Sequence, residues 1–289
     1  MSSTTRFAPS PTGYLHLGHA FAAVTAAESG DRFLLRVEDI DSGRCRPEFE
    51  TAIFEDLTWL GLDWPKPALR QSVRMAAYRT ALESLKARDL IYPCFCTRQE
   101  IAEEIARAVQ APHHQDNAAA QLAPEGTLYP GTCRTLSAAE RAKRIASGTP
   151  CALRLDARKA AREVGSLGFE ERGAGPQGET GCIAVDPLKF GDVVLARKDM
   201  PTSYHLAVVV DDAFQGVDLV TRGNDLFAAA HIQRVLQALL GLPAPAYAHH
   251  RLILDKHGRK FSKRDGAVTL RAMREAGITP AAIRVRLGL

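Results

Sequence analysis

The sequence lacks long hydrophobic runs. Its longest apolar stretches, residues 21–27 and 206–210, fall far short of the ~20 residues that a membrane-spanning helix needs. The first 11 residues contain one arginine and no run of seven or more apolar residues, so the pattern of a secretory signal is missing as well. From these absences we expect a cytoplasmic protein with neither a signal peptide nor a membrane anchor, and with no membrane partner.

A large excess of one charge is also missing. The 289 residues include 37 Lys and Arg against 33 Asp and Glu, a formal net charge of +4, which permits a polyanionic partner without requiring one. Hydrophobic residues make up 46%, enough for the core of one large or two small domains. The sequence shows no internal repeat, heptad pattern or long apolar stripe, so we expect a monomer.

Cysteine is sparse, with six residues in the whole chain. Without a secretory signal, this number argues against a disulfide framework and for metal binding, catalysis or burial. Cys45, Cys151 and Cys182 have no closely spaced partner, and we expect them to be packing residues.

The first 90 residues alternate strand and helix patterns. An apolar strand at residues 4–8 is followed by a Pro-rich turn and an Ala-rich helix at 16–29, and a second strand at 33–37 ends in an acidic cluster. Helical periodicity then covers residues 48–61 and 75–88. This alternation predicts an α/β fold with a doubly wound parallel sheet of the Rossmann type, whose ligands bind beyond the carboxyl ends of the strands.

The pattern changes near residue 91 and resumes near residue 190. Between these points we expect a short helix at 99–109, a surface loop at 113–126 and a Gly-rich loop at 173–181. The later segments predict strands at 192–197, 204–211, 217–222 and 250–254, helices at 225–240 and from Thr279 onward, and a polar loop at 255–265. The predicted division is 1–90 for the first half of the nucleotide-binding fold, 91–190 for an inserted module, 191–241 for the second half, and 242–289 for a lysine-rich loop and a short helical C-terminal segment.

Residues 134–162 form the most basic stretch, with eight Lys or Arg against two acidic side chains. Such a stretch can contact an RNA backbone, with an affinity that falls as salt rises. A solvated amphipathic helix around residues 137–147 explains much of the same charge. The sequence leaves both interpretations open.

His16 and His19 lie on one face of a helix's first turn, and Gly18 between them lets another group approach the backbone. A helix N-terminus favours anions, and two imidazole donors there suit a phosphate chain. Taken alone this pattern is weak. A second feature is the loop around Lys260 and Lys263, whose ammonium groups can neutralise the pyrophosphate that leaves when the α-phosphate of ATP is attacked.

Five motifs in this order resemble the catalytic domain of class I glutamyl-tRNA synthetases. They are Arg-Phe-Ala-Pro-Ser-Pro-Thr-Gly at 6–13, His-Leu-Gly-His at 16–19, Val-Glu-Asp-Ile-Asp at 37–41, Val-Thr-Arg-Gly-Asn-Asp at 220–225 and Lys-Phe-Ser-Lys-Arg at 260–264. The resemblance covers nearly the whole chain. It implies an enzyme that activates L-glutamate with ATP, and Mg²⁺ is expected with the nucleotide.

The resemblance also implies a role for each matching residue. Catalytic roles fall on His16, His19, Lys260 and Lys263, and ATP contacts fall on His16, Gly18, His19 and Lys263. The residues expected around glutamate are Arg6, Phe7, Ala8, Pro9, Ser10, Glu38, Tyr204 and Arg222. Among these, Glu38 can accept the substrate ammonium, and the arginines offer planar forks for carboxylates.

Glutamyl-tRNA synthetases carry an anticodon-binding domain after the lysine loop, whereas only 25 residues follow Arg264 here. The chain is therefore similar to a shortened branch of the family that transfers glutamate to the queuosine base of tRNA(Asp), and no anticodon-binding domain is expected. Alternatives are a minimal enzyme that charges tRNA(Glu) at its 3′ end, a non-catalytic RNA-binding relative, and a small-molecule adenylyl or nucleotidyl transferase that shares only the histidine motif.

Cys94, Cys96 and Cys133 are expected to converge if the intervening chain folds back as a hairpin. Three thiolates suit Zn²⁺. From the residues alone, the fourth ligand is His113, His114 or water, or the cysteines are simply buried. The resemblance favours Tyr129 as the fourth ligand of one structural zinc ion, because the shortened branch uses a tyrosine at this place.

Overall fold

The protein is described from a computed structural model that covers residues 3–110, 122–123, 126–254 and 268–289. Its helices are α1 (Leu17–Glu28), α2 (Pro47–Trp59), α3 (Met75–Ala87), α4 (Arg98–Gln110), α5 (Ala138–Ala146), α6 (Ala157–Val164), α7 (Tyr204–Gln215), α8 (Ala229–Leu240), α9 (Leu270–Glu275) and α10 (Pro280–Leu287). Short 3-10 helices are η1 (Gln71–Arg74), η3 (Thr132–Arg134) and η4 (Asn224–Leu226). The strands are β1 (Thr4–Phe7), β2 (Arg32–Val37), β3 (Leu69–Arg70), β4 (Ile91–Cys94), β5 (Leu122–Ala123), β6 (Gly126–Thr127), β7 (Ala152–Leu155), β8 (Gly168–Glu171), β9 (Gly181–Ala184), β10 (Val194–Ala196), β11 (Leu219–Gly223) and β12 (Ala246–His250).

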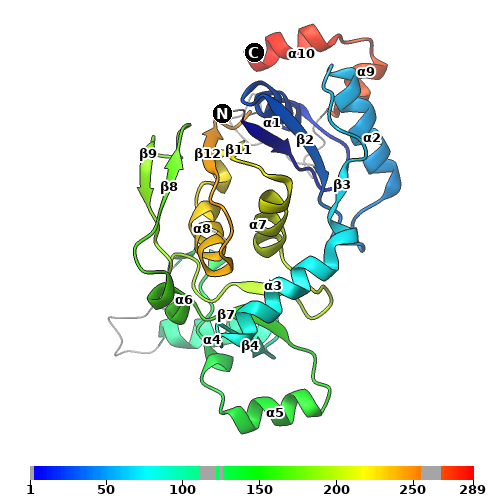
Figure 1. The fold of residues 1–289 in the computed structure, drawn as a ribbon. Coiled ribbons are helices and arrows are strands. Elements are labelled where there is room, and N and C mark those ends of the chain that lie inside the picture. Colours follow the sequence, from blue (N-terminus) through cyan, green and yellow to red (C-terminus); the bar gives the residue numbers. More distant parts are fainter. Residues whose placement is uncertain (1–2, 111–121, 124–125, 255–267) are drawn as a thin grey trace.

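Parallel strands form the main body of the protein, in the upper half of Figure 1. β1 pairs in parallel with β2, β2 with β3, and β11 with β12. The two groups meet where the Asp218 N–H donates to Thr4 O (3.2 Å) and the Thr4 N–H donates to Asp218 Oδ1 (2.9 Å). The carboxyl ends of β1, β2 and β11 are therefore brought to one side of the main body, where open α/β folds bind their ligands.

Both faces of β2 are buried, which explains its nearly continuous apolar sequence. Phe33 and Leu35 pack into a cluster with α1, α2, α9 and α10. Leu34 points to the opposite face and packs with Val220 and Tyr247. This alternation follows from the two-residue period of a strand.

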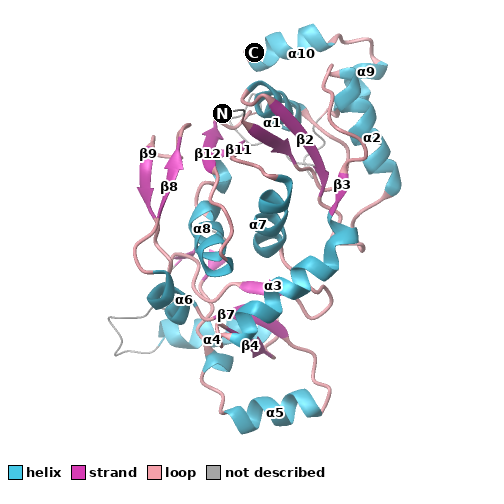
Figure 2. Ribbon diagram, viewed as in Figure 1, coloured by secondary structure: helices cyan, strands magenta, loops and turns pink. Residues whose placement is uncertain are grey.

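A smaller antiparallel sheet of β4, β7 and β10 lies at the opposite end of the molecule from β1 and β2 (Figure 2). β8 and β9 form an antiparallel hairpin, and β8 joins the main body through the pairing of Glu171 with Tyr247 on β12. Part of the segment 91–190 thus pairs with a main-body strand, while β10 pairs back onto the small sheet. The division of the chain near residues 91 and 190 stays a prediction.

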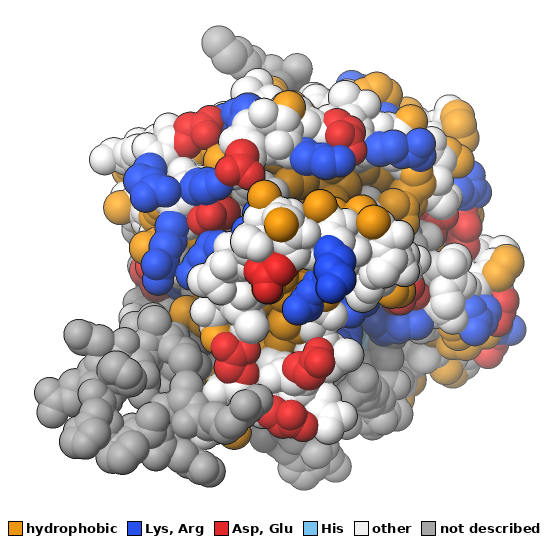
Figure 3. Space-filling view, turned by 90° about the horizontal axis from the view of Figure 1, so that it is seen from below, with side chains coloured by type: hydrophobic (Ala, Val, Ile, Leu, Met, Phe, Trp, Pro, Cys, Tyr) orange, Lys and Arg blue, Asp and Glu red, His pale blue; other side chains and the backbone are white. Residues whose placement is uncertain are grey.

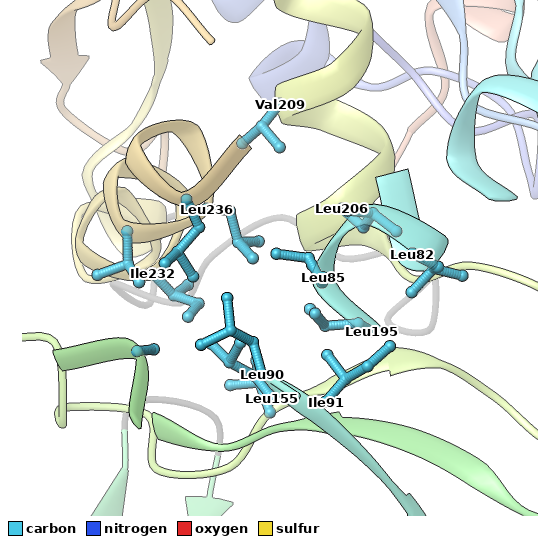
Figure 4. Packing of buried hydrophobic residues seen from close by; sticks show 14 of the residues in the cluster. Leu82, Leu85, Leu90, Ile91, Leu155, Leu195, Leu206, Val209, Ile232 and Leu236 are labelled. Atoms are coloured by element: carbon cyan, nitrogen blue, oxygen red, sulfur yellow. The ribbon is translucent and has the colours of Figure 1, made fainter. Parts of the chain in front are cut away.

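The largest hydrophobic cluster joins the two sheets. In Figure 4 leucines of α3, α7 and α8 pack down onto side chains of the small sheet. Leu85, Leu155, Leu195, Leu206 and Leu236 are fully buried. Because α7 and α8 also follow or precede the strands of the main body, this packing fixes the small sheet relative to the parallel strands.

The strand predicted at residues 204–211 is wrong, because this segment begins α7. Its apolar run, Leu206 to Val210, does not alternate, and such a run fits a buried helix as well as a buried strand. The helix begins at Ser203 as its N-cap and ends at Gly216, which has a positive φ of 64°. The consecutive apolar residues are explained by burial on most sides of this helix.

The strand predicted at residues 250–254 is misplaced by four residues. The observed strand β12 ends at His250, and its residues pair one by one with β11 from Leu219 to Gly223. Tyr247 and His249 alternate with less buried neighbours and are both buried, as expected in a strand.

Most of the other predicted elements are confirmed to within four residues at either end. They include β1, β2, α1, α2, α3, α4, α8, β11 and the Thr279-capped α10. The sequence did not predict α9. The greater part of the predicted loop at 113–126, and the polar loop at 255–265, lie outside the described residues.

No helix in the described ranges combines the length and the apolar character that crossing a membrane requires.

The basic stretch 134–162 covers α5, β7 and α6 at the lower end of the molecule. The predicted solvated helix is confirmed as α5, which has no buried residue and is capped by Ser137. Figure 3 views this end from below and shows Lys and Arg side chains interspersed with Asp and Glu. Contact of this stretch with RNA stays a prediction.

Candidate active site

A cavity of about 420 Å³ lies among β1, β2, α7 and β11. Seven of the eight residues predicted to surround glutamate line it: Arg6, Phe7, Ala8, Ser10, Glu38, Tyr204 and Arg222. The eighth, Pro9, lies in the same loop, and its carbonyl accepts a hydrogen bond from the Glu38 N–H (3.0 Å). The structure therefore brings together the ends of four elements that are far apart in the sequence.

Charged side chains beneath this cavity form a buried network. Asp212 Oδ1 accepts hydrogen bonds from Arg6 Nε (3.0 Å) and from Arg36 Nη1 (2.6 Å), and Arg36 Nη2 donates to Glu38 Oε1 (3.3 Å). The two arginines and two carboxylates balance in charge. All four are 9% exposed or less, so each charge depends on its partners for compensation.

Glu38 has a perturbed protonation equilibrium. Burial raises the pKa of its carboxyl above the ordinary value, although Arg36 and Arg6 oppose the rise. An ammonium group placed in the cavity would add a further positive neighbour and favour the ionised form. Asp212 behaves in the opposite way: burial alone would raise its pKa, but Arg6 and Arg36 outweigh burial and the pKa is lowered.

Arg222 reaches the cavity from the end of β11. Its Nε donates to His249 Nε2 (2.9 Å) and its Nη1 donates to Gln233 Oε1 (2.8 Å). Its Nη2 is buried and has no hydrogen-bond partner among the described residues. The guanidinium thus keeps one donor nitrogen for a further acceptor such as a carboxylate.

A second cavity of about 190 Å³ is lined by His16, Gly18 and His19. His16 caps α1, because its Nδ1 accepts the Gly18 N–H (3.1 Å), and His19 Nδ1 accepts the His16 N–H (3.2 Å). The two imidazole rings lie 3.8 Å apart between centroids. A Cβ at Gly18 would lie 3.1 Å from His16 Cε1, so glycine keeps this approach open.

The two cavities are neighbours. Ala22, Gly223 and Leu226 line both of them. Two ligands bound in these cavities would therefore lie on either side of a thin common wall. Lys260 and Lys263, predicted to act on the phosphates, lie outside the described residues.

Cys94, Cys96 and Cys133 come together as predicted, with their sulfur atoms within 4.8 Å of one another. The Tyr129 hydroxyl lies 3.5 Å from Cys94 Sγ and 3.5 Å from Cys96 Sγ. Three thiols and one phenol at these separations are a donor set that fits a tetrahedral ion such as Zn²⁺. His113 and His114, the other candidate ligands, lie outside the described residues.

Sequence reasoning missed the residues that support the cavity from behind. Arg36, Glu171, Asp212, Gln233 and His249 are all buried and hydrogen-bonded around the predicted ligands. One signal was available, since Arg36 stands between Leu35 and Val37 in an otherwise apolar strand. A charged residue in that position must be paired.

Comparison with known proteins gives consistent results. Residues 3–289 match the family model for class I tRNA synthetases (E and Q), catalytic domain. The solved glutamate tRNA ligase of Elizabethkingia meningosepticum, described in complex with its amino acid, superposes with a TM-score of 0.71 at 28% identity, over 92% of this chain and 53% of that chain. The present chain thus spans about half the length of that structure.

The chain belongs to the class I tRNA synthetases of the E and Q type. Among its relatives, the glutamyl-Q tRNA(Asp) synthetase of Rhodobacter capsulatus is 49% identical over 99% of both chains. That of Nocardia farcinica is 47% identical over 95% of this chain and 80% of its own length. Within its class, the chain therefore belongs to the glutamyl-Q tRNA(Asp) synthetases.

Proposed function

We propose that this protein activates L-glutamate with ATP and transfers the glutamyl group to the queuosine base at the wobble position of tRNA(Asp). The observation that carries the proposal is the charged cavity next to the histidine-lined cavity. Residues of four of the five motifs line the two. The printed names of the relatives support the choice of acceptor.

The residues of the larger cavity match the charges of glutamate. Glu38 accepts the substrate ammonium, while Arg6 and Arg222 bind the carboxylates. Phe7, Ala8, Pro9 and Ser10 form the loop against the substrate backbone, and the Tyr204 ring closes the wall. The free amino acid carries one positive and two negative charges, so these groups compensate each of them.

In the first step, an α-carboxylate oxygen of glutamate attacks the α-phosphorus of ATP, and pyrophosphate leaves. In the second, a ring hydroxyl of queuosine attacks the activated carbonyl and AMP leaves. His16 and His19 stabilise phosphate charge, with the N-terminus of α1 and Gly18 at the nucleotide. Lys263 neutralises the departing pyrophosphate, and Lys260 is an auxiliary contact. The class implies ATP with Mg²⁺, which is held largely by the phosphates.

We infer that Cys94, Cys96, Tyr129 and Cys133 hold one zinc ion. When bound, the ion supplies structural cross-linking only, because four protein ligands leave no open position. The ligands join β4 to the segment around η3, so the ion would stabilise the inserted module. We also infer that the parallel strands of the main body form one doubly wound sheet.

The test is transfer of labelled glutamate, with ATP and Mg²⁺, to three RNAs. They are tRNA(Asp) containing queuosine, the same tRNA lacking it, and tRNA(Glu). We expect label on the first RNA alone. Label on tRNA(Glu) would instead make the protein a minimal enzyme that charges a 3′ end. No label on any RNA and no pyrophosphate release would favour a non-catalytic relative.

A variant of Arg222 tests whether the larger cavity is the glutamate site. Arg222→Met removes the guanidinium but keeps an unbranched side chain, and we expect glutamate-dependent pyrophosphate exchange to fall by about a hundredfold. Arg234→Met on α8 is the control, because Arg234 donates to Gly168 O, away from both cavities. Equal losses in both variants would show that the cavity is not the glutamate site.

A further inference from the structure

A chain of three buried side chains runs from β8 through β12 to the cavity. Arg222 Nε donates to His249 Nε2 (2.9 Å), and His249 Nδ1 lies 2.5 Å from Glu171 Oε2. The side chains of His249 and Glu171 are fully buried. None of the five family motifs includes Glu171 or His249.

The hydrogen bonds define the tautomer of His249. An arginine nitrogen only donates, so His249 Nε2 must be the unprotonated acceptor. The ring proton is therefore on Nδ1, where it is donated to the Glu171 carboxylate. Glu171 cannot turn away, because its Oε1 accepts the backbone N–H groups of Gly173 (2.9 Å) and His249 (2.8 Å).

The surroundings keep His249 neutral. Its ring stacks on Tyr247 with 5.8 Å between centroids, and the Phe227 ring meets it edge-on at 5.2 Å. The charged or titratable groups that face it are Glu171 on β8, Arg222 on β11 and His250 on β12. Burial, the largest influence, lowers the pKa of His249, and Arg222 lowers it further, while Glu171 acts in the opposite direction.

Two acceptors thus fix the orientation of Arg222 before any substrate binds. His249 holds Nε and Gln233 holds Nη1, and Nη2 is left without a hydrogen-bond partner among the described residues. A protonated His249, or one with its proton on Nε2, would place a donor against the donor at Arg222 Nε. The guanidinium would then have to turn.

We propose that Glu171 and His249 are positioning residues, which hold Arg222 so that its free edge meets a carboxylate of glutamate. This inference rests on the proposed function of the cavity. Its consequence is a selective effect on substrate binding: disturbing the pair weakens the binding of glutamate and leaves the chemical step nearly unchanged.

The decisive variant is Glu171→Gln, which has the same shape. Its amide oxygen still accepts the two backbone N–H groups, so its NH₂ donates toward His249 Nδ1. The ring proton then moves to Nε2, where it faces the N–H of Arg222 Nε and the hydrogen bond between them is lost. We expect the KM for L-glutamate to rise tenfold or more, with kcat changed less than threefold, in pyrophosphate exchange measured with queuosine-containing tRNA(Asp) present.

Two variants of His249 complete the test. His249→Phe keeps the ring stacking but removes both nitrogens, and we expect the same rise in KM. His249→Gln can accept from Arg222 and donate to Glu171, and we expect it to restore KM to within threefold of the wild type. The matched control is His231→Phe, since His231 is a buried histidine whose Nδ1 accepts the Asp186 N–H and does not touch Arg222. It should lower the melting temperature without changing KM.

The result that overturns the proposal is an unchanged KM in both Glu171→Gln and His249→Phe. Nitrogen-15 chemical shifts of His249 give a readout that does not depend on activity, and a proton on Nε2 in the wild type would also overturn it. Failure of the proposed function looks different. In that case the wild type itself shows no glutamate-dependent exchange, and the positioning role fails with it.

Discussion

The cavity network and the cysteine cluster both bury polar groups, but they are completed in different ways. In the cavity, Asp212 is buried between Arg6 and Arg36, and the chain itself supplies the compensating charge. In the cysteine cluster, the sulfur atoms contact one another and the Tyr129 hydroxyl. The difference teaches that the first site is compensated by charges of the chain itself, whereas the proposed zinc ion would complete the second.

Removing the buried carboxylate of Asp212, which compensates Arg6 and Arg36, should give the largest effect on stability. In Asp212→Asn, Arg6 and Arg36 remain buried with one carboxylate fewer, and we expect the free energy of unfolding to fall by about 3–5 kcal/mol. Urea unfolding measures this change. Glu170→Gln is the control, because Glu170 pairs with Arg172 at the surface, and its unfolding midpoint should not move. If Asp212→Asn matched the control, the network would not be what holds the cavity together.

Removing the proposed zinc ion should affect the cysteine cluster and leave the cavity network unchanged. We expect Cys96→Ser, or treatment with a strong chelator, to reduce bound zinc from one ion per chain to none. Transfer of glutamate to tRNA should fall more than tenfold, while glutamate-dependent pyrophosphate exchange stays within twofold, because none of the cluster residues lines either cavity. Elemental analysis and the two assays check this. Cys182 is exposed, so its prediction as a packing residue is wrong, and Cys182→Ser should retain the metal. Zinc retained by Cys96→Ser would disprove the ligand set.

Asp56 on α2 is intermediate between the two sites, because it is a buried carboxylate whose charge is only partly compensated. Its ion-pair partner is Arg274 (3.4 Å), with Arg271 as a second nearby cation. Neither carboxylate oxygen has a hydrogen-bond partner in the described structure, and burial raises its pKa to about 6. Because the folded pKa is raised, Asp56 stabilises the fold below pH ~4, and this contribution is lost as the pH rises through about 6.

Asp56→Asn imitates the protonated form at every pH. We expect it to match the wild type near pH 4 and to exceed it by about 1 kcal/mol at pH 7.5 in free energy of unfolding. Urea unfolding over this pH range gives the curve. A variant that is less stable than the wild type at pH 7.5 would show that the Arg274 pair outweighs burial.

The smallest effect is expected for the exposed charges of α5. Lys143→Gln should leave the melting temperature unchanged, and if α5 meets the RNA backbone, the slope of log affinity for tRNA against log salt should shrink by about one. Lys86→Gln on α3 is the control for charge alone. Equal slopes for the two variants would favour the interpretation of α5 as a solvated helix only.

Local patterns predicted much of the fold. The Ala-rich segment that begins at His16 became α1, and Thr279 with Pro280 marked the start of α10, because caps and periodicity act within a few residues. The run at 204–211 was misassigned because its apolar residues do not alternate. Its helical state depends on packing against α8 and the small sheet, which a local pattern does not contain.

The candidate site was predictable only in its outer layer. Glu38 and Arg222 lie in recognisable sequence motifs, so both could be predicted as site residues. The residues behind them include His249 and Asp212. Their roles depend on hydrogen-bond partners that lie 27 and 206 positions away in the sequence. Burial of charge depends on long-range pairing, and one sequence without its contacts does not reveal that pairing.

Gly223 is one of three residues, with Ala22 and Leu226, that separate the proposed glutamate cavity from the histidine-lined cavity. A Cβ there would lie 2.5 Å from Asp225 Oδ1 and 2.8 Å from Leu252 Cδ2, so no other residue fits without displacing both neighbours. Two molecules bound in the adjoining cavities would therefore be held a short distance apart by groups of the same few residues.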